Sequence, residues 1–168
     1  LLRDVANMRK RLDSELHTDC IFELKHLRGG LIDIEFIVQY LTLRYAPKHP
    51  EILGLGTQET LSTLLEFNLL PAATGTSLTK TLDLWQNLQG LLALTIEGKI
   101  TIDREDEISK ALKKDLVKVA SKFTIDFNGR IDNFEHLKIV IAQQADKVYN
   151  IFRNLIEIPA ARIKSIKT

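Results

Sequence analysis

Apolar residues recur every three or four positions through most of this 168-residue chain, which is the spacing of one buried face of an α-helix. No stretch alternates between apolar and polar residues in the manner of a half-buried strand. Eight glycines and four prolines leave few breaks in the helical pattern. The sequence therefore predicts an all-α fold, a bundle of about six helices. The first predicted stripe consists of Leu1, Val5, Met8, Leu12 and Leu16.

The helix that begins at Leu31 is apolar on most sides, which is typical of the central helix of a bundle. The segment before it, "CIFELKHL", is expected to be a loop. A later helix is expected to have Thr57 as its N-cap. The last helix is expected to begin near Asp132 or Asn133 and to stop at Pro159, which would leave the basic end "ARIKSIKT" as a frayed tail.

The composition argues against several classes of protein. Basic residues number 23 and acidic residues 22, so the net charge of +1 gives no field that would attract nucleic acid or an anionic membrane. No apolar run approaches the roughly 20 residues that span a bilayer. Cys20 is the single cysteine, so no internal disulfide can form and a reducing, cytoplasmic location is expected. Because the first residues already have a mid-helix pattern, we interpret the chain as one helical domain, residues 1–168, cut from a longer protein.

Two glycines stand directly before the central helix, in the stretch "RGGLIDIEF". Gly29 and Gly30 allow the backbone to turn sharply and to approach another surface closely. The free N–H groups of the helix start, next to Lys25 and Arg28, would attract an anion such as a phosphate or a partner's carboxylate. In the alternative interpretation, Asp33 caps the helix and the two basic side chains are solvated.

Asp33 and Glu35 are not expected to chelate one metal ion together. Residues i and i+2 of a helix point to nearly opposite sides, so the two carboxylates should have separate roles. We expect Asp33 to act as a cap or an interface acid, and Glu35 to pair with a base or with Gln39, one turn further on.

No other cluster has the spacing of a known site. His17, Asp19 and Cys20 lack a second group of matching ligands, so a structural zinc site is not expected. Arg130 and His136 have the spacing of a pair that some small helical ribonucleases use at a phosphodiester. Since Arg130 precedes the predicted helix, we treat that match as chance.

The longer stretch "ELKHLRGGLIDIEFIVQYL" resembles the signature at the head of the helical domain of glutamine synthetase adenylyltransferases, which attach AMP to glutamine synthetase and remove it. The family's pattern is an acidic residue, Leu, Lys, a glycine pair, Asp, Ile or Val, Glu, Phe and an apolar run into Gln. The matching positions are Glu23, Leu24, Lys25, Gly29, Gly30, Asp33, Ile34, Glu35, Phe36, Ile37 and Gln39. Leu27 departs from the family, because many members carry a glycine there.

The resemblance implies that residues 1–17 form a helix connecting this domain to a nucleotidyltransferase core, in the C-terminal half of the enzyme. In the family, ATP, Mg²⁺ and the catalytic Asp-x-Asp acids belong to that core, and its Gly-Ser-x-x-Asp-x-Asp pattern is absent from this chain. No catalytic residue, metal ligand or cofactor is therefore expected here. The chain alone is expected to be inactive in AMP transfer.

The resemblance further implies a helical accessory and regulatory domain in the control of nitrogen assimilation. Its expected partners are its own nucleotidyltransferase core, glutamine synthetase and a PII-type signal protein, with no nucleic acid and no membrane. The candidates for contact with nucleotide phosphates or with the core are Lys25, Arg28, Gly29, Gly30, Asp33 and Glu35. The alternative is a docking module for glutamine synthetase or a PII-type protein that makes no direct catalytic contribution.

Overall fold

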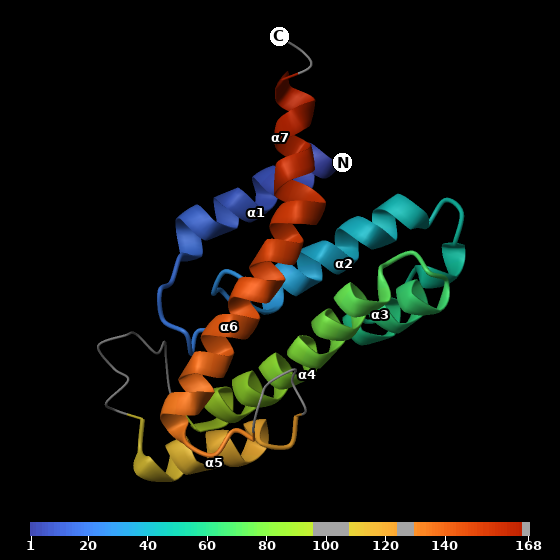
Figure 1. Cartoon of the computed structure of the whole chain (residues 1–168). Coiled ribbons are helices and arrows are strands. Elements are labelled where there is room, and N and C mark those ends of the chain that lie inside the picture. Colours follow the sequence, from blue (N-terminus) through green and yellow to red (C-terminus); the bar gives the residue numbers. More distant parts are fainter. Residues whose placement is uncertain (96–107, 124–129, 166–168) are drawn as a thin grey trace.

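The computed structural model describes residues 1–95, 108–123 and 130–165. Helices and turns are the only structure within these ranges, which confirms the prediction of an all-α bundle of about six helices (Figure 1). The elements are α1 (Leu2–Leu16), α2 (Leu31–Tyr45), η1 (Pro50–Ile52), α3 (Thr57–Glu66), α4 (Ala72–Thr95), α5 (Lys110–Ala120), α6 (Phe134–Phe152), η3 (Arg153–Glu157) and α7 (Ile158–Ser165).

The central helix is α2, as its apolar sequence predicts. It contacts α1, α3, α4 and α6. Ile34 and Ile37 of α2 are 0% exposed, and they share one core with Trp85 of α4 and Phe152 of α6, which are equally buried. The site described below lies where this core meets the start of α2.

One continuous rod is formed by α6, η3 and α7, the orange-to-red helix of Figure 1. The expectation that Pro159 stops the last helix is therefore wrong. In η3, a π-helical turn, the N–H of Ile158 bonds to the carbonyl of Arg153, five residues back. A proline ring normally clashes with the preceding turn of an α-helix, and this wider turn gives the ring room. The predicted frayed tail is likewise wrong up to Ser165, because α7 is helical and contacts α1.

One predicted helix start agrees with the structure, and one predicted cap differs from it. The last helix begins where it is expected, near Asp132 or Asn133: Asn133 is the N-cap of α6, and its side chain accepts a hydrogen bond from the N–H of His136. At α3 the N-cap is Gly56, and Thr57, the predicted cap, is the first helical residue. The Glu59 side chain accepts the N–H of Gly56, which closes this helix start without a capping side chain.

Candidate functional site

The two glycines before α2 lie inside the bundle. Gly29 has a φ of +81°, and a Cβ there would overlap the backbone of Ala145 on α6. A Cβ on Gly30 would overlap the carbonyl of Leu24. The glycines thus allow the turn to approach the chain's own helix α6. The close approach that the glycine pair predicts is therefore made to α6 of this chain and not to a surface outside the bundle.

The start of α2 is not open to an anion. The N–H groups of Leu31 and Ile32 donate to the carbonyls of Leu24 and Lys25, at 2.9 and 3.3 Å. A helix start normally leaves these donors unpaired. The expectation of free N–H groups here is wrong, because residues 21–30 form the predicted loop as tight turns that fold back and supply the acceptors.

Asp33 lies at the centre of a buried polar network. Its side chain is 0% exposed, and its Oδ1 accepts hydrogen bonds from Arg9 Nε at 2.6 Å and from Arg28 Nη1 at 3.0 Å. Its Oδ2 accepts the N–H of Gly29. Two cations and a backbone donor compensate the cost of burying this carboxylate. Asp33 therefore ties α1, the glycine turn and α2 together.

Arg28 is held on every side by the chain itself. Its Nη2 lies 2.7 Å from Glu157 of η3, and its guanidinium lies over the rings of Tyr149, at 4.4 Å, and Phe152, at 5.0 Å. The side chain is only 17% exposed. The alternative in which Arg28 is solvated is therefore wrong. Arg28 is already paired with Asp33 and Glu157, so an outside anion would have to compete with two carboxylates for its guanidinium.

Trp85 of α4 adds a hydrogen bond to this network. Its indole N–H donates to the carbonyl of Gly29 at 3.0 Å, and the ring is 0% exposed. Both backbone polar groups of Gly29 are thus satisfied within the chain. We call this network the joint; its members are Arg9, Arg28, Gly29, Asp33, Trp85 and Glu157.

Sequence reasoning does not identify three members of the joint: Arg9, Trp85 and Glu157. Val5 and Arg9, four residues apart, form the buried face of α1, whereas Met8, predicted for that face, is 58% exposed. A charged residue on a helix is normally taken as solvent-facing. One signal in the sequence could have indicated that Arg9 is buried. Arg9 lies four residues after Val5, on the same helix face, and the central helix carries an acid, Asp33, that could pair with it.

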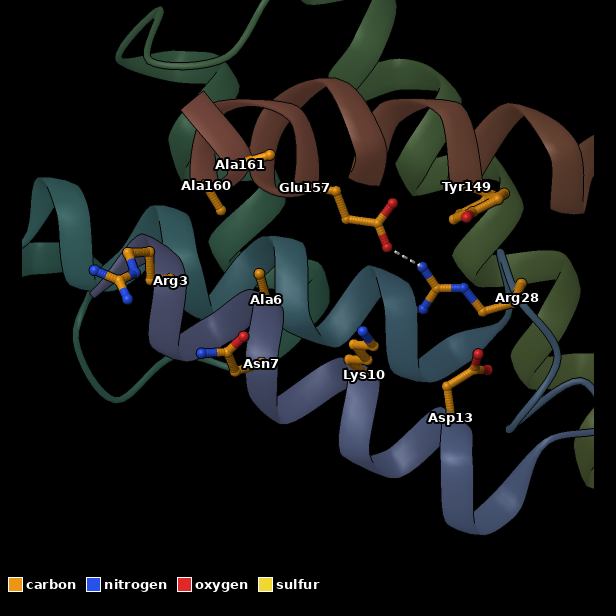
Figure 2. A pocket seen from close by; sticks show the side chains of 10 residues that line it. All are labelled: Arg3, Ala6, Asn7, Lys10, Asp13, Arg28, Tyr149, Glu157, Ala160 and Ala161. Carbon is orange, nitrogen blue, oxygen red and sulfur yellow. Dashed lines mark hydrogen bonds and ion pairs between the residues drawn. The ribbon is translucent and has the colours of Figure 1, made fainter. Parts of the chain in front are cut away.

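A pocket of about 390 Å³ lies beside the joint, between α1 and the rod (Figure 2). Arg3 and Lys10 line it from α1, and Glu157 lines it from the rod, paired with Arg28. The volume is within the range of small-ligand sites. Because Asp13 and Glu157 stand among the cations, the pocket has no strong preference for an anion.

Lys25 and Glu35 are the two candidate residues outside the joint, and both are exposed. Glu35 lines a groove on the side of α2 that faces away from Asp33, together with Gln39. The predicted separation of Asp33 and Glu35 is confirmed. The predicted partner of Glu35 is not found: its carboxylate forms no ion pair or hydrogen bond with the residues that the structure describes.

The other candidate clusters do not assemble into sites. Within the described ranges, no three His, Cys, Asp or Glu side chains gather closely enough to hold a metal ion. Arg130 is exposed and lies before α6, whereas His136 is on α6 and 3.4 Å from Asp132. The described helices include none with both the length and the apolar character that crossing a membrane requires.

Comparison with known proteins gives one family match and a consistent set of relatives. The family model described as GlnD PII-uridylyltransferase matches residues 3–156. Bifunctional glutamine synthetase adenylyltransferase/adenylyl-removing enzymes from Bradyrhizobium sp. and Xanthobacter autotrophicus are 29% and 31% identical over 94% and 95% of the chain. The enzyme of that description from Rhodopseudomonas palustris strain TIE-1 is 31% identical over 93%. The chain spans about 15% of the length of these relatives. No solved structure matches.

Proposed function

This chain belongs to the GlnD PII-uridylyltransferase family, and from its similarity to bifunctional glutamine synthetase adenylyltransferase/adenylyl-removing enzymes we propose that it is the helical accessory domain of an enzyme that adenylylates and deadenylylates glutamine synthetase. In this proposal α1 is the helix that connects the domain to a nucleotidyltransferase core. The core supplies the catalytic acids and binds ATP and Mg²⁺. The domain holds the core in position and is inactive alone. A cytoplasmic location belongs to the same proposal.

The observation that carries the positioning role in this proposal is the buried ion pair between Arg9 of α1 and Asp33 of α2. The two side chains are 2% and 0% exposed. A buried pair of this kind is costly to break, because either partner alone would be left as an uncompensated charge. It therefore fixes the direction of α1 relative to the bundle, and with it the direction of whatever α1 connects to.

The test is AMP transfer to glutamine synthetase, and AMP removal, by the full-length enzyme carrying Arg9→Lys. Lysine keeps the charge but cannot reproduce the directional contacts of the guanidinium. We expect both rates to fall on the order of 10- to 100-fold, the effect of a small misplacement of catalytic groups. Arg11→Lys, at an exposed position of the same helix, is the matched control. Unchanged rates in a folded Arg9→Lys enzyme would remove the positioning role.

Lys25 is the better of the two candidate cations for a nucleotide phosphate outside this chain. It is exposed, whereas Arg28 is already paired with two carboxylates. The Lys25 carbonyl accepts the N–H of Ile32, which anchors its backbone at the start of α2. Lys25→Ala should raise the KM for ATP in the full-length enzyme without changing its stability. If ATP binding and turnover are both unchanged, Lys25 has no phosphate role.

A second candidate function is a docking module for glutamine synthetase or a PII-type signal protein. The groove beside Glu35 favours it, because exposed leucines border that groove. Capture of purified glutamine synthetase or PII-type protein by the 168-residue chain would support this function. Absence of binding to both would count against it.

A further inference from the structure

Three leucines are exposed where α2 leads into α3. Leu43 and Leu53 are each 55% exposed, and Leu55 is 37% exposed. Leu43 and Leu55 line the groove that contains Glu35, whose volume is about 400 Å³, and Leu53 belongs to the same loop. Single exposed leucines are ordinary, but apolar side chains gathered at one groove are characteristic of interaction surfaces. We call this feature the leucine groove.

The backbone of the loop presents its leucines outward. Gly54 has a φ of +77°, and nothing lies within 4 Å of the position that a Cβ would occupy. The glycine is therefore required by the turn itself and not by close packing. Ile52, at the end of η1, is 1% exposed, whereas the leucines on either side of Gly54 are not packed away. The loop has a defined shape whose leucines lack a covering surface in the described part of the chain.

One charged group stands in the groove. Glu35 forms no ion pair with any described residue, and Gln39, one turn later, lines the same groove. Asp33, two residues earlier, faces the joint, so α2 serves the joint with one side and the groove with the other. The occupant that fits is an apolar surface carrying a Lys or Arg, because it would cover the leucines and pair with the carboxylate.

The groove extends along α2 from Glu35 to Leu43 and into the loop that follows. Figure 1 shows α1 and α2 running in roughly opposite directions, so the N-terminus lies toward the end of α2 that leads into η1. The two helices are in contact, and the Arg9–Asp33 pair fixes them to each other. A core joined to this domain through α1 would therefore arrive at the end of α2 that carries Leu43.

We propose that the leucine groove is the surface on which the nucleotidyltransferase core of the enzyme docks, meeting it with apolar side chains and one basic side chain paired to Glu35. This inference rests on the proposed function. It places the contact with the core on the side of α2 opposite the glycine turn. Of the six residues that the sequence nominates, Glu35 is then the one in the docking surface, and Lys25 keeps its separate proposed role at a nucleotide phosphate.

The test compares the rate of thiol labelling at the groove between the 168-residue chain and the full-length enzyme. Leu43→Cys and Ile139→Cys are matched, because both residues are 55% exposed on helices, α2 and α6, and the native Cys20 is only 4% exposed. Each variant is treated with a maleimide reagent, in the 168-residue chain and in the full-length enzyme. Labelling at each position is followed by peptide mass spectrometry. We expect labelling of Leu43→Cys to be at least about tenfold slower in the full-length enzyme, which corresponds to a groove covered for nine-tenths of the time. Ile139→Cys should label equally fast in both.

Adding Glu35→Lys to the Leu43→Cys enzyme should restore fast labelling, because the core would then meet a like charge. Equal labelling of Leu43→Cys in the chain and in the enzyme would overturn the proposal, as would protection of Ile139→Cys to the same degree. Protection that appears only after glutamine synthetase or a PII-type protein is added would assign the groove to that partner instead. Labelling does not depend on catalysis, so the two proposals can fail separately. Protection at Leu43 together with normal AMP transfer by Arg9→Lys would reject the positioning role of the Arg9–Asp33 pair and still support docking of the core at the leucine groove.

Discussion

Arg9 of α1 and Asp33 of α2 form an ion pair of 2.6 Å inside the bundle, with 2% and 0% of their side chains exposed. Arg9 also lies 3.5 Å from Asp13 of its own helix, through Nη1. The pair joins a helix at the start of the chain to the central helix. Its loss should therefore affect the docking of α1 more than the rest of the core.

Arg9→Met tests the energy of this pair. Methionine fills much of the same space but leaves the buried Asp33 with one cation fewer, and we expect the free energy of unfolding to fall by about 3 kcal/mol. Urea unfolding of the 168-residue chain measures it. Arg11→Met, at an exposed position of α1, should change the stability by less than about 0.5 kcal/mol. Equal effects of the two substitutions would show that Arg9 does not anchor α1.

Gly29→Ala and Gly54→Ala separate backbone conformation from crowding. The two glycines have φ values of +81° and +77°, so alanine has nearly the same conformational cost at each, about 1–2 kcal/mol. Only at Gly29 would the new Cβ overlap a neighbour, the backbone of Ala145, whereas nothing lies within 4 Å at Gly54. Gly29→Ala should therefore be the more destabilising by at least about 2 kcal/mol, in thermal or urea unfolding. Similar losses would mean that the turn can move away from α6 at little cost.

Glu157→Gln tests how much of the joint depends on the rod. The Arg28–Glu157 pair is partly exposed, at 17% and 36%, so its removal should lower the free energy of unfolding by no more than about 1 kcal/mol. The loss should shrink in high salt, because exposed ion pairs are screened. Urea unfolding at low and high salt gives the comparison. A loss as large as that of Arg9→Met would instead make Glu157 an equal anchor of the joint.

The fold could be predicted from the sequence because helical periodicity is a local property. The centrality of α2 follows from its apolar residues on most sides, and the separation of Asp33 from Glu35 follows from helix geometry alone. Asn133 is a cap for the same local reason, since its side chain reaches the N–H of His136 three residues later.

The joint could not be predicted, because its partners come from distant parts of the chain. A glycine pair allows close approach to any surface, and nothing local indicates that the surface is Ala145 of α6. The rule that Pro159 should end a helix is also local. That rule fails here because the π-helical turn of η3 lets the rod continue past Pro159. The rod keeps Phe152 and Ile156 in the core, where both are 0% exposed.

Trp85→Phe tests the hydrogen bond that closes the joint from α4. Phenylalanine retains the aromatic ring but cannot donate to the Gly29 carbonyl, which the indole N–H reaches at 3.0 Å. The ring is 0% exposed, so that carbonyl would lose a partner where water does not easily replace it. We expect a loss of about 1–3 kcal/mol in the free energy of unfolding, followed by circular dichroism because the substitution removes the chain's single tryptophan. Combining Trp85→Phe with Gly29→Ala should give less than the sum of the two losses, since both disturb the same turn. Strict additivity would show that Trp85 and Gly29 stabilise the protein independently.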